Sequence, residues 1–84
     1  MDLAERLAES LNRLREEAGL NQKELAKRLG MSHATVHRLL RGDRGTTLRT
    51  LEDLCDALDC TPNDLFEPGR LKVPARRRGR SRAR

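Results

Sequence analysis

The sequence contains almost no aromatic residues: Phe66 is the single aromatic residue in 84, and Trp and Tyr are absent. Strands of a β-sandwich are usually rich in aromatic and β-branched residues. Proteins that bind single-stranded nucleic acid usually stack bases on aromatic side chains. Both classes are therefore disfavoured. Leu, Ala, Glu and Arg are abundant instead, and these residues favour helices.

Long apolar runs are also missing. No stretch approaches the roughly 20 apolar residues of a membrane-spanning helix, and no signal peptide is recognised at the beginning. We therefore expect a cytoplasmic, nucleoid-associated protein without a membrane partner. Cysteine is scarce, with Cys55 and Cys60 only. In a protein that is not secreted, two cysteines are expected to be free thiols.

Positive charge is unevenly distributed along the chain. Residues 1–69 hold 10 Lys and Arg against 13 Asp and Glu, a balance of −3. Residues 70–84 hold 8 basic and no acidic residues, a balance of +8. Like charges at this density repel one another, and residues 76–84 have little apolar surface to bury. We expect a folded domain over 1–69 and a disordered basic tail over 70–84.

Apolar residues recur at helical spacing through residues 1–69. Leu3, Leu7, Leu11 and Leu14 predict a first helix over about 2–18. Shorter helices are expected between Asn21 and Gly30, between Ser32 and Gly42, and from Thr47 to about 58. The apolar side of the last of these holds Leu48, Leu51, Leu54, Cys55 and Leu58. A fifth helix of one or two turns is expected before Pro68. The predicted fold class is all-α, a compact five-helix domain.

The expected helix boundaries carry recognisable capping residues. Asn21 followed by Glu24 has the pattern of a capping box. Thr61, Pro62 and Asp64 give a strong helix start, with Thr as the cap and Pro at the first helical position. Ser32 and Thr47 are the expected caps of the third and fourth helices. Gly19, Gly30 and Gly42 are expected to end the first three helices.

The second and third helices are joined by only three residues, Gly30, Met31 and Ser32. Two short helices with a glycine-containing turn are typical of a helix-turn-helix over about 22–41. In it Ala26 is small where the helices cross, and Val36 locks the third helix onto the core.

The segments LNQKELAKRLGMSHATVHRLLRG and TLRTLEDLCDALDCTPNDLFE resemble the phage-repressor and Cro-like (XRE-type) helix-turn-helix family, over roughly 11–67. The resemblance implies a five-helix, lambda-repressor-like domain. Its members usually bind double-stranded DNA as homodimers and act as transcriptional regulators, commonly repressors. Many relatives also pair an arginine of the first helix with an acid near position 40. Here that position is Leu40, so Arg15 has no such partner.

The face of the third helix opposite Val36, Leu39 and Leu40 is expected to read bases, because a major groove admits one helix and contacts its N-terminal residues. The expected base-reading residues are Ser32, His33, Ala34, His37 and Arg38. Arg38 suits the O6 and N7 atoms of guanine.

Other residues are expected to contact phosphates. The resemblance assigns a phosphate contact to Gln22, at a helix N-terminus with free N–H groups. By position, further candidates are Lys23, Thr35, Arg41, Arg44, Thr46 and Thr47. In the tail they are Arg76, Arg77, Arg78, Arg80, Arg82 and Arg84.

No catalytic constellation or cofactor motif is recognised, so neither an enzymatic activity nor a cofactor is expected. His33 and His37 have a spacing that can bind zinc, but no third and fourth ligand accompany them, and we predict no metal site. Two alternative functions stay open. One is an antitoxin-type or other interaction module that binds a protein partner such as a toxin or a polymerase. The other is an RNA or ribosome binder driven by the basic tail.

Overall fold

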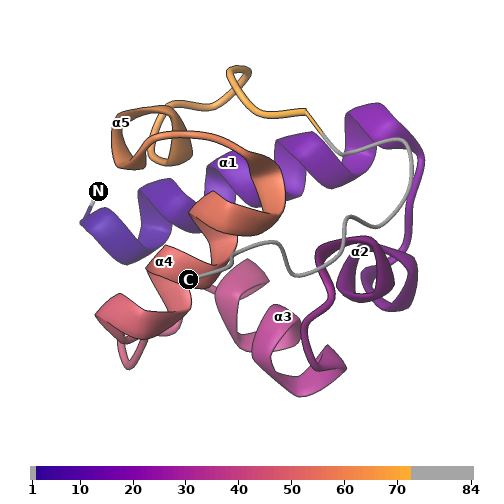
Figure 1. The fold of residues 1–84 in the computed structure, drawn as a ribbon, viewed down its shortest axis with the longest axis horizontal. Coiled ribbons are helices and arrows are strands. Elements are labelled where there is room, and N and C mark those ends of the chain that lie inside the picture. The colour runs from indigo at the N-terminus through magenta and orange to yellow at the C-terminus, as the bar shows by residue number, and fades with distance from the viewer. Residues whose placement is uncertain (1, 73–84) are drawn as a thin grey trace.

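Five helices form the protein in the computed structural model, which describes residues 2–72 (Figure 1). They are α1 (Leu3–Ala18), α2 (Gln22–Leu29), α3 (His33–Leu40), α4 (Leu48–Leu58) and α5 (Pro62–Leu65). No strand occurs in the described part of the chain, and the expected all-α, five-helix fold is confirmed. In the ribbon view α1 crosses the middle of the molecule, with α5 on one side and α3 on the other.

Every helix begins with a side chain that accepts a hydrogen bond from a backbone N–H of the first turn. The expected caps of α2 to α5 are all confirmed, and Asp2 caps α1. In α2 the Asn21 side chain accepts from Glu24 N at 2.8 Å, and Glu24 Oε1 accepts from Asn21 N at 2.9 Å. This reciprocal pair satisfies two N–H groups that would otherwise lack partners.

Helix ends follow the sequence with one variation. Gly19 and Gly30 end α1 and α2 in the left-handed conformation, as predicted. At the end of α3 the cap is Arg41, and Gly42 follows it with φ 79°. A side chain at position 42 would meet Ala8 Cβ and the Ala4 carbonyl oxygen at 3.8 and 3.9 Å, so the chain after α3 runs close to α1.

The core consists almost entirely of leucines contributed by all five helices. Its buried members are Leu7, Leu11, Leu14, Leu25, Ala26, Leu29, Val36, Leu39, Leu40, Leu54, Leu58, Leu65 and Leu71. Two apolar positions that the periodicity assigned to the inner face lie outside, since Leu3 is 63% and Leu48 79% exposed. Each is the first residue of its helix, at the end of the apolar stripe, where less of the body covers it.

The folded body runs past the boundary expected at residue 69. Leu71 is only 5% exposed and belongs to the core. Arg70 forms ion pairs with Asp64 at 3.2 Å and Glu67 at 3.3 Å. A single leucine between two basic residues carries no periodic signal, which is why the sequence assigned this segment to the tail. The expected disorder of the tail and its six arginines, at 76–78, 80, 82 and 84, lie outside the described residues.

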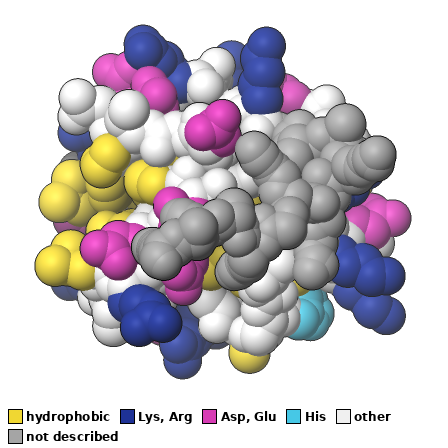
Figure 2. Space-filling view, viewed as in Figure 1, with side chains coloured by type: hydrophobic (Ala, Val, Ile, Leu, Met, Phe, Trp, Pro, Cys, Tyr) yellow, Lys and Arg dark blue, Asp and Glu magenta, His cyan; other side chains and the backbone are white. Residues whose placement is uncertain are grey.

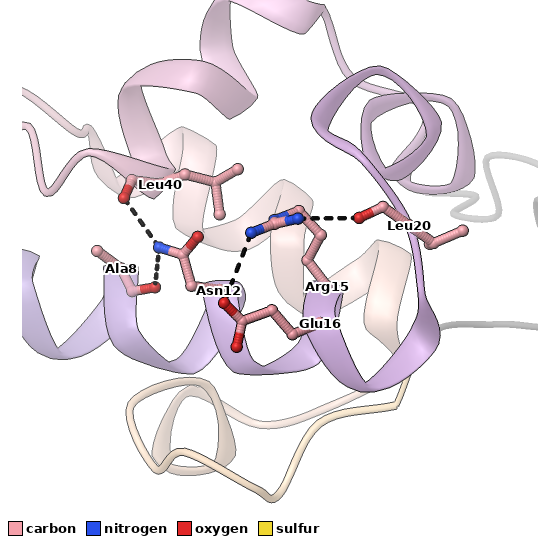
Figure 3. A network of polar contacts seen from close by, with 6 residues as sticks. All are labelled: Ala8, Asn12, Arg15, Glu16, Leu20 and Leu40. Atoms are coloured by element: carbon pink, nitrogen blue, oxygen red, sulfur yellow. Dashed lines mark hydrogen bonds and ion pairs between the residues drawn. The ribbon is translucent and has the colours of Figure 1, made fainter.

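Asn12 ties α3 to α1 (Figure 3). Its side-chain Nδ2 donates to the Ala8 carbonyl at 2.9 Å and to the Leu40 carbonyl at 3.0 Å. Leu40 is the last residue of α3, so its carbonyl has no partner within the helix. The amide of α1 therefore satisfies the end of α3 and fixes its position.

Arg15 lies on the same helix and makes different contacts, as expected from the leucine at position 40. Its Nη1 donates to the Leu20 carbonyl at 3.0 Å, and its Nη2 lies 3.7 Å from Glu16 Oε2 (Figure 3). The guanidinium thus supports the turn after α1 rather than α3.

Replacing Asn12 with Ala should lower the free energy of unfolding by about 1–3 kcal/mol, because the Leu40 carbonyl loses its donor in a half-buried place. The measurement is urea-induced unfolding followed by circular dichroism. Asn63→Ala, at an exposed position of α5, is the matched control and should change stability much less. Equal stability of the Asn12 variant and the intact protein would contradict this role.

Candidate nucleic-acid interface

The turn between α2 and α3 is built by backbone bonds that the sequence permits at that place. Gly30 adopts φ 69°, and the N–H of Met31 donates to the Ala26 carbonyl at 3.0 Å. This left-handed turn is the ordinary end of a helix at glycine. It places α3 across α2, with Val36, Leu39 and Leu40 in the core.

The opposite side of α3 faces solvent. All five residues expected to read bases are exposed: Ser32, His33, Ala34, His37 and Arg38. Arg41 is also exposed and ends the same face. No acidic residue occurs in α3. The helix therefore offers donors and a small apolar side chain with no carboxylate among them.

Ser32 has a structural role besides its predicted contact. Its hydroxyl accepts from the Thr35 N–H at 3.1 Å and donates to Thr35 Oγ1 at 2.8 Å. The hydroxyl proton is thus directed to Thr35 Oγ1, and the Ser32 oxygen keeps only the capacity to accept one further hydrogen bond. Base reading by Ser32 stays a prediction, now restricted to a contact in which Ser32 Oγ accepts a hydrogen bond from the base.

Gln22 and His37 are joined by a hydrogen bond that the sequence did not predict. His37 Nδ1 lies 3.0 Å from Gln22 Oε1, so the first residue of α2 contacts the middle of α3. Gln22 is predicted to contact a phosphate and His37 a base. They form a single polar unit on the outer side of the two helices.

A shallow hollow lies between α3 and the N-terminus of α4. Four hydroxyls line it, from Thr35, Thr46, Thr47 and Thr50, and we call it the threonine hollow. Arg38 and Asp43 border it as well. Thr35, Thr46 and Thr47, which are predicted to contact phosphates, thus line the same hollow as Arg38, which is predicted to read a base. Thr50 was missed, because only the fold brings it to this place.

Arg44, which is also predicted to contact a phosphate, forms an ion pair with Asp2. Its Nε donates to Asp2 Oδ2 at 2.7 Å. The backbone N–H of Glu5, together with Arg44, holds the pKa of Asp2 below its ordinary value, so the carboxylate is charged. A phosphate would have to compete with Asp2 for this guanidinium. Lys23 is exposed on α2, and Lys27 lies exposed one turn later, a further basic residue that the sequence did not indicate as a phosphate contact.

Charge is separated within the domain although its total is close to neutral. Residues 22–41 hold five Lys and Arg against one acid, a balance of +4. Residues 42–69 hold two basic and seven acidic residues, a balance of −5. In the space-filling view a histidine lies beside a group of Lys and Arg side chains at the lower right, the region of α2 and α3 (Figure 2). By this count, the helix-turn-helix segment is the net positive part of the domain.

Cys55 and Cys60 lie at the end of α4, half-buried against the core. Burial raises the pKa of both thiols, that of Cys60 to about 12. Within residues 2–72 no group of three or more His, Cys, Asp or Glu side chains is arranged to hold a metal ion. None of the helices in this range has the length and apolar character needed to cross a membrane.

Comparison with known proteins agrees with this architecture. A family described as "Helix-turn-helix domain" matches residues 6–67. A protein of Sinorhizobium fredii named "Uncharacterized HTH-type transcriptional regulator y4dJ" is 37% identical over 68 residues, which cover 81% of this chain and 88% of the relative. A solved structure from Neisseria, described as the hypothetical transcription factor NHTF, superimposes with a TM-score of 0.65 at 28% identity, covering 81% of this chain and 78% of the other. The chain therefore belongs to the helix-turn-helix domain family.

Proposed function

We propose that this protein is a DNA-binding transcriptional regulator, and specifically a repressor, that inserts α3 into the major groove. The observation that carries the proposal is the exposed face of α3, which is free of acids and lies in the net positive part of the domain. The Sinorhizobium relative is named a transcriptional regulator, and the Neisseria structure a hypothetical transcription factor. Such a protein acts by binding DNA and not by catalysis, and it works at the nucleoid in the cytoplasm.

The residues of α3 divide the work by their chemistry. Arg38 carries donors that suit guanine O6 and N7, and Ala34 allows close approach and contact with a thymine methyl group. His33 and His37 flank these two on the same face. Ser32 contributes an acceptor at the beginning of the helix.

Phosphate contacts surround this reading face. Gln22 and Lys23 at the start of α2 serve one strand, aided by the N-terminal N–H groups and the positive end of the helix dipole. Hydroxyls of Thr35, Thr46 and Thr47, which line the threonine hollow, serve the other side of the groove. The exposed Arg41 and Arg44 are assigned to the same strand. Arg44 exchanges Asp2 for a phosphate when DNA binds. Such contacts position a protein, while base contacts specify the sequence.

The general test is selection of bound duplexes from random DNA by the full chain, followed by sequencing. A recurring palindromic site is expected. Enrichment without any shared sequence would contradict sequence-specific binding, and stronger competition by structured RNA would favour the RNA-binding alternative.

Replacing Arg38 with Ala should cost about 1–3 kcal/mol of binding free energy at the selected site and relax the preference at one base position, with little change on unrelated DNA. Equilibrium titration on both duplexes measures this. Arg6→Ala, which removes an exposed arginine of α1, is the matched control. An equal loss on every duplex would assign Arg38 to a phosphate at the threonine hollow instead.

A homodimer is expected on the complete site, because a single α3 offers only a small reading surface. Its two half-sites should lie about 34 Å apart, one helical turn, on one face of the duplex. Footprinting and sedimentation of the complex measure the symmetry and the stoichiometry. One protomer on a full-length site would rule out the homodimer.

Ending the chain after Lys72 removes six arginines while keeping Leu71 in the core. Affinity for all duplexes should fall, and the slope of log K against log salt should flatten by about 0.9 for each phosphate that the tail neutralises. Base preference should persist, because α3 is intact. The matched control keeps all 84 residues and replaces the six arginines with Gln. An unchanged slope would make the tail a passive extension, and a lost preference would show that it reads a groove.

A further inference from the structure

The contact between Gln22 Oε1 and His37 Nδ1 favours one tautomer of the His37 ring. In this orientation of the Gln22 amide the contacting atom is the oxygen Oε1, which only accepts, so the His37 tautomer that completes the bond is the one in which Nδ1, 3.0 Å away, donates. A neutral imidazole has one N–H, and its other nitrogen is an acceptor. When Gln22 holds the proton at Nδ1, Nε2 of His37 is therefore an acceptor.

We infer that Gln22 and His37 form one recognition unit, in which His37 reads an amino group of adenine or cytosine through Nε2. The inference rests on the proposed function and deepens it by naming the base atom. Phosphate oxygens, guanine O6 and N7, adenine N7 and thymine O4 are all acceptors in the major groove. The hydrogen-bond donors there are the adenine N6 and cytosine N4 amino groups. An acceptor at Nε2 can pair only with these.

The same bond also indicates the role of the NH₂ group of the Gln22 amide. With Oε1 engaged by His37, the two amide hydrogens of Gln22 remain for an acceptor. A backbone phosphate offers only acceptors, so this orientation suits the predicted phosphate contact. One hydrogen bond thus directs the donors of Gln22 toward the backbone and the acceptor of His37 toward the bases.

His37 and Arg38 become complementary readers in this arrangement. Arg38 has donors only and selects acceptors such as those of guanine. His37, its neighbour on the exposed face of α3, selects a donor. The pair therefore requires a base acceptor and a base amino group at adjacent places in the groove. Two side chains that both donate would require two acceptors and no amino group.

The proton on Nδ1 can be tested without DNA. In the ¹⁵N spectrum of the full chain at mildly alkaline pH, His37 should show the shifts of the Nδ1–H form. His33 lies exposed one turn earlier on α3 and serves as the internal control, expected to show the mixture of an unbonded imidazole. Gln22→Ala leaves the Asn21–Glu24 capping box in place and should return His37 to that mixture. An Nε2–H form of His37 in the intact protein would overturn the inference.

The base contact is tested on the site selected from random DNA. At the base pair whose preference His37→Ala relaxes, replacing adenine with 2-aminopurine, or cytosine with an analogue lacking N4, removes the major-groove amino group. Affinity of the intact protein should fall about threefold to tenfold, the range of one neutral hydrogen bond, while His37→Ala should be unaffected. A 7-deazapurine in that pair, which removes an acceptor, should leave both proteins unchanged.

The outcomes separate this inference from the proposed function. Sensitivity to the 7-deazapurine, or no base preference lost in His37→Ala, overturns the reading by His37 while sequence-specific binding stands. Failure to select any shared sequence overturns the proposed function itself, and with it the base contact, whatever the ¹⁵N spectrum shows.

Discussion

The position of α3 depends on the amide of Asn12. A helix of eight residues is too short to be stable by itself, and its last carbonyls need partners from outside. Asn12 supplies one from α1, while Val36, Leu39 and Leu40 anchor the helix from below. The resemblance to the phage-repressor family implies that relatives with an acid near position 40 join α1 and α3 by an ion pair with an arginine of the first helix. Here a leucine side chain enters the core and its backbone oxygen makes the polar link, so the same two helices are fixed without a charge.

A second constraint is the way three helices end. The N–H of Leu20 donates to the Arg15 carbonyl, that of Met31 to Ala26, and that of Cys60 to Cys55, each at 3.0 Å. This repeated turn needs a left-handed residue, supplied by Gly19, Gly30 and Asp59 in order. The side chains at the two ends of such a bond usually make an apolar contact. Cys55 and Cys60 occupy these two places, which accounts for both cysteines as packing residues.

Local signals therefore predicted much of the fold. Caps at Asn21, Ser32, Thr47 and Thr61 could be recognised because a cap involves residues only three apart. What the sequence did not indicate depends on contacts between distant residues. Asn12 meets Leu40 across 28 positions, and Arg44 meets Asp2 across 42. Leu71 was assigned to the tail and Leu48 to the core for the same reason: burial is decided by what the fold places nearby. The exposed face of α3 was predictable, whereas the Gln22–His37 bond was not.

Separation of charge connects the body to its proposed task. A balance of −3 over residues 1–69 suggests a domain that DNA would repel, yet the helix-turn-helix carries +4 and residues 42–69 carry −5. A polyanion attracts the first and repels the second, so the field of the duplex turns the domain until α3 faces it. The acids of α4 and α5 thereby disfavour the reversed orientation. Salt weakens both this attraction and this repulsion. In the proposed complex, the choice of bases by hydrogen bonding does not depend on these long-range forces. Orientation and sequence preference are thus separable properties of the proposed complex, the first carried by the charges of the whole domain and the second by one face of α3.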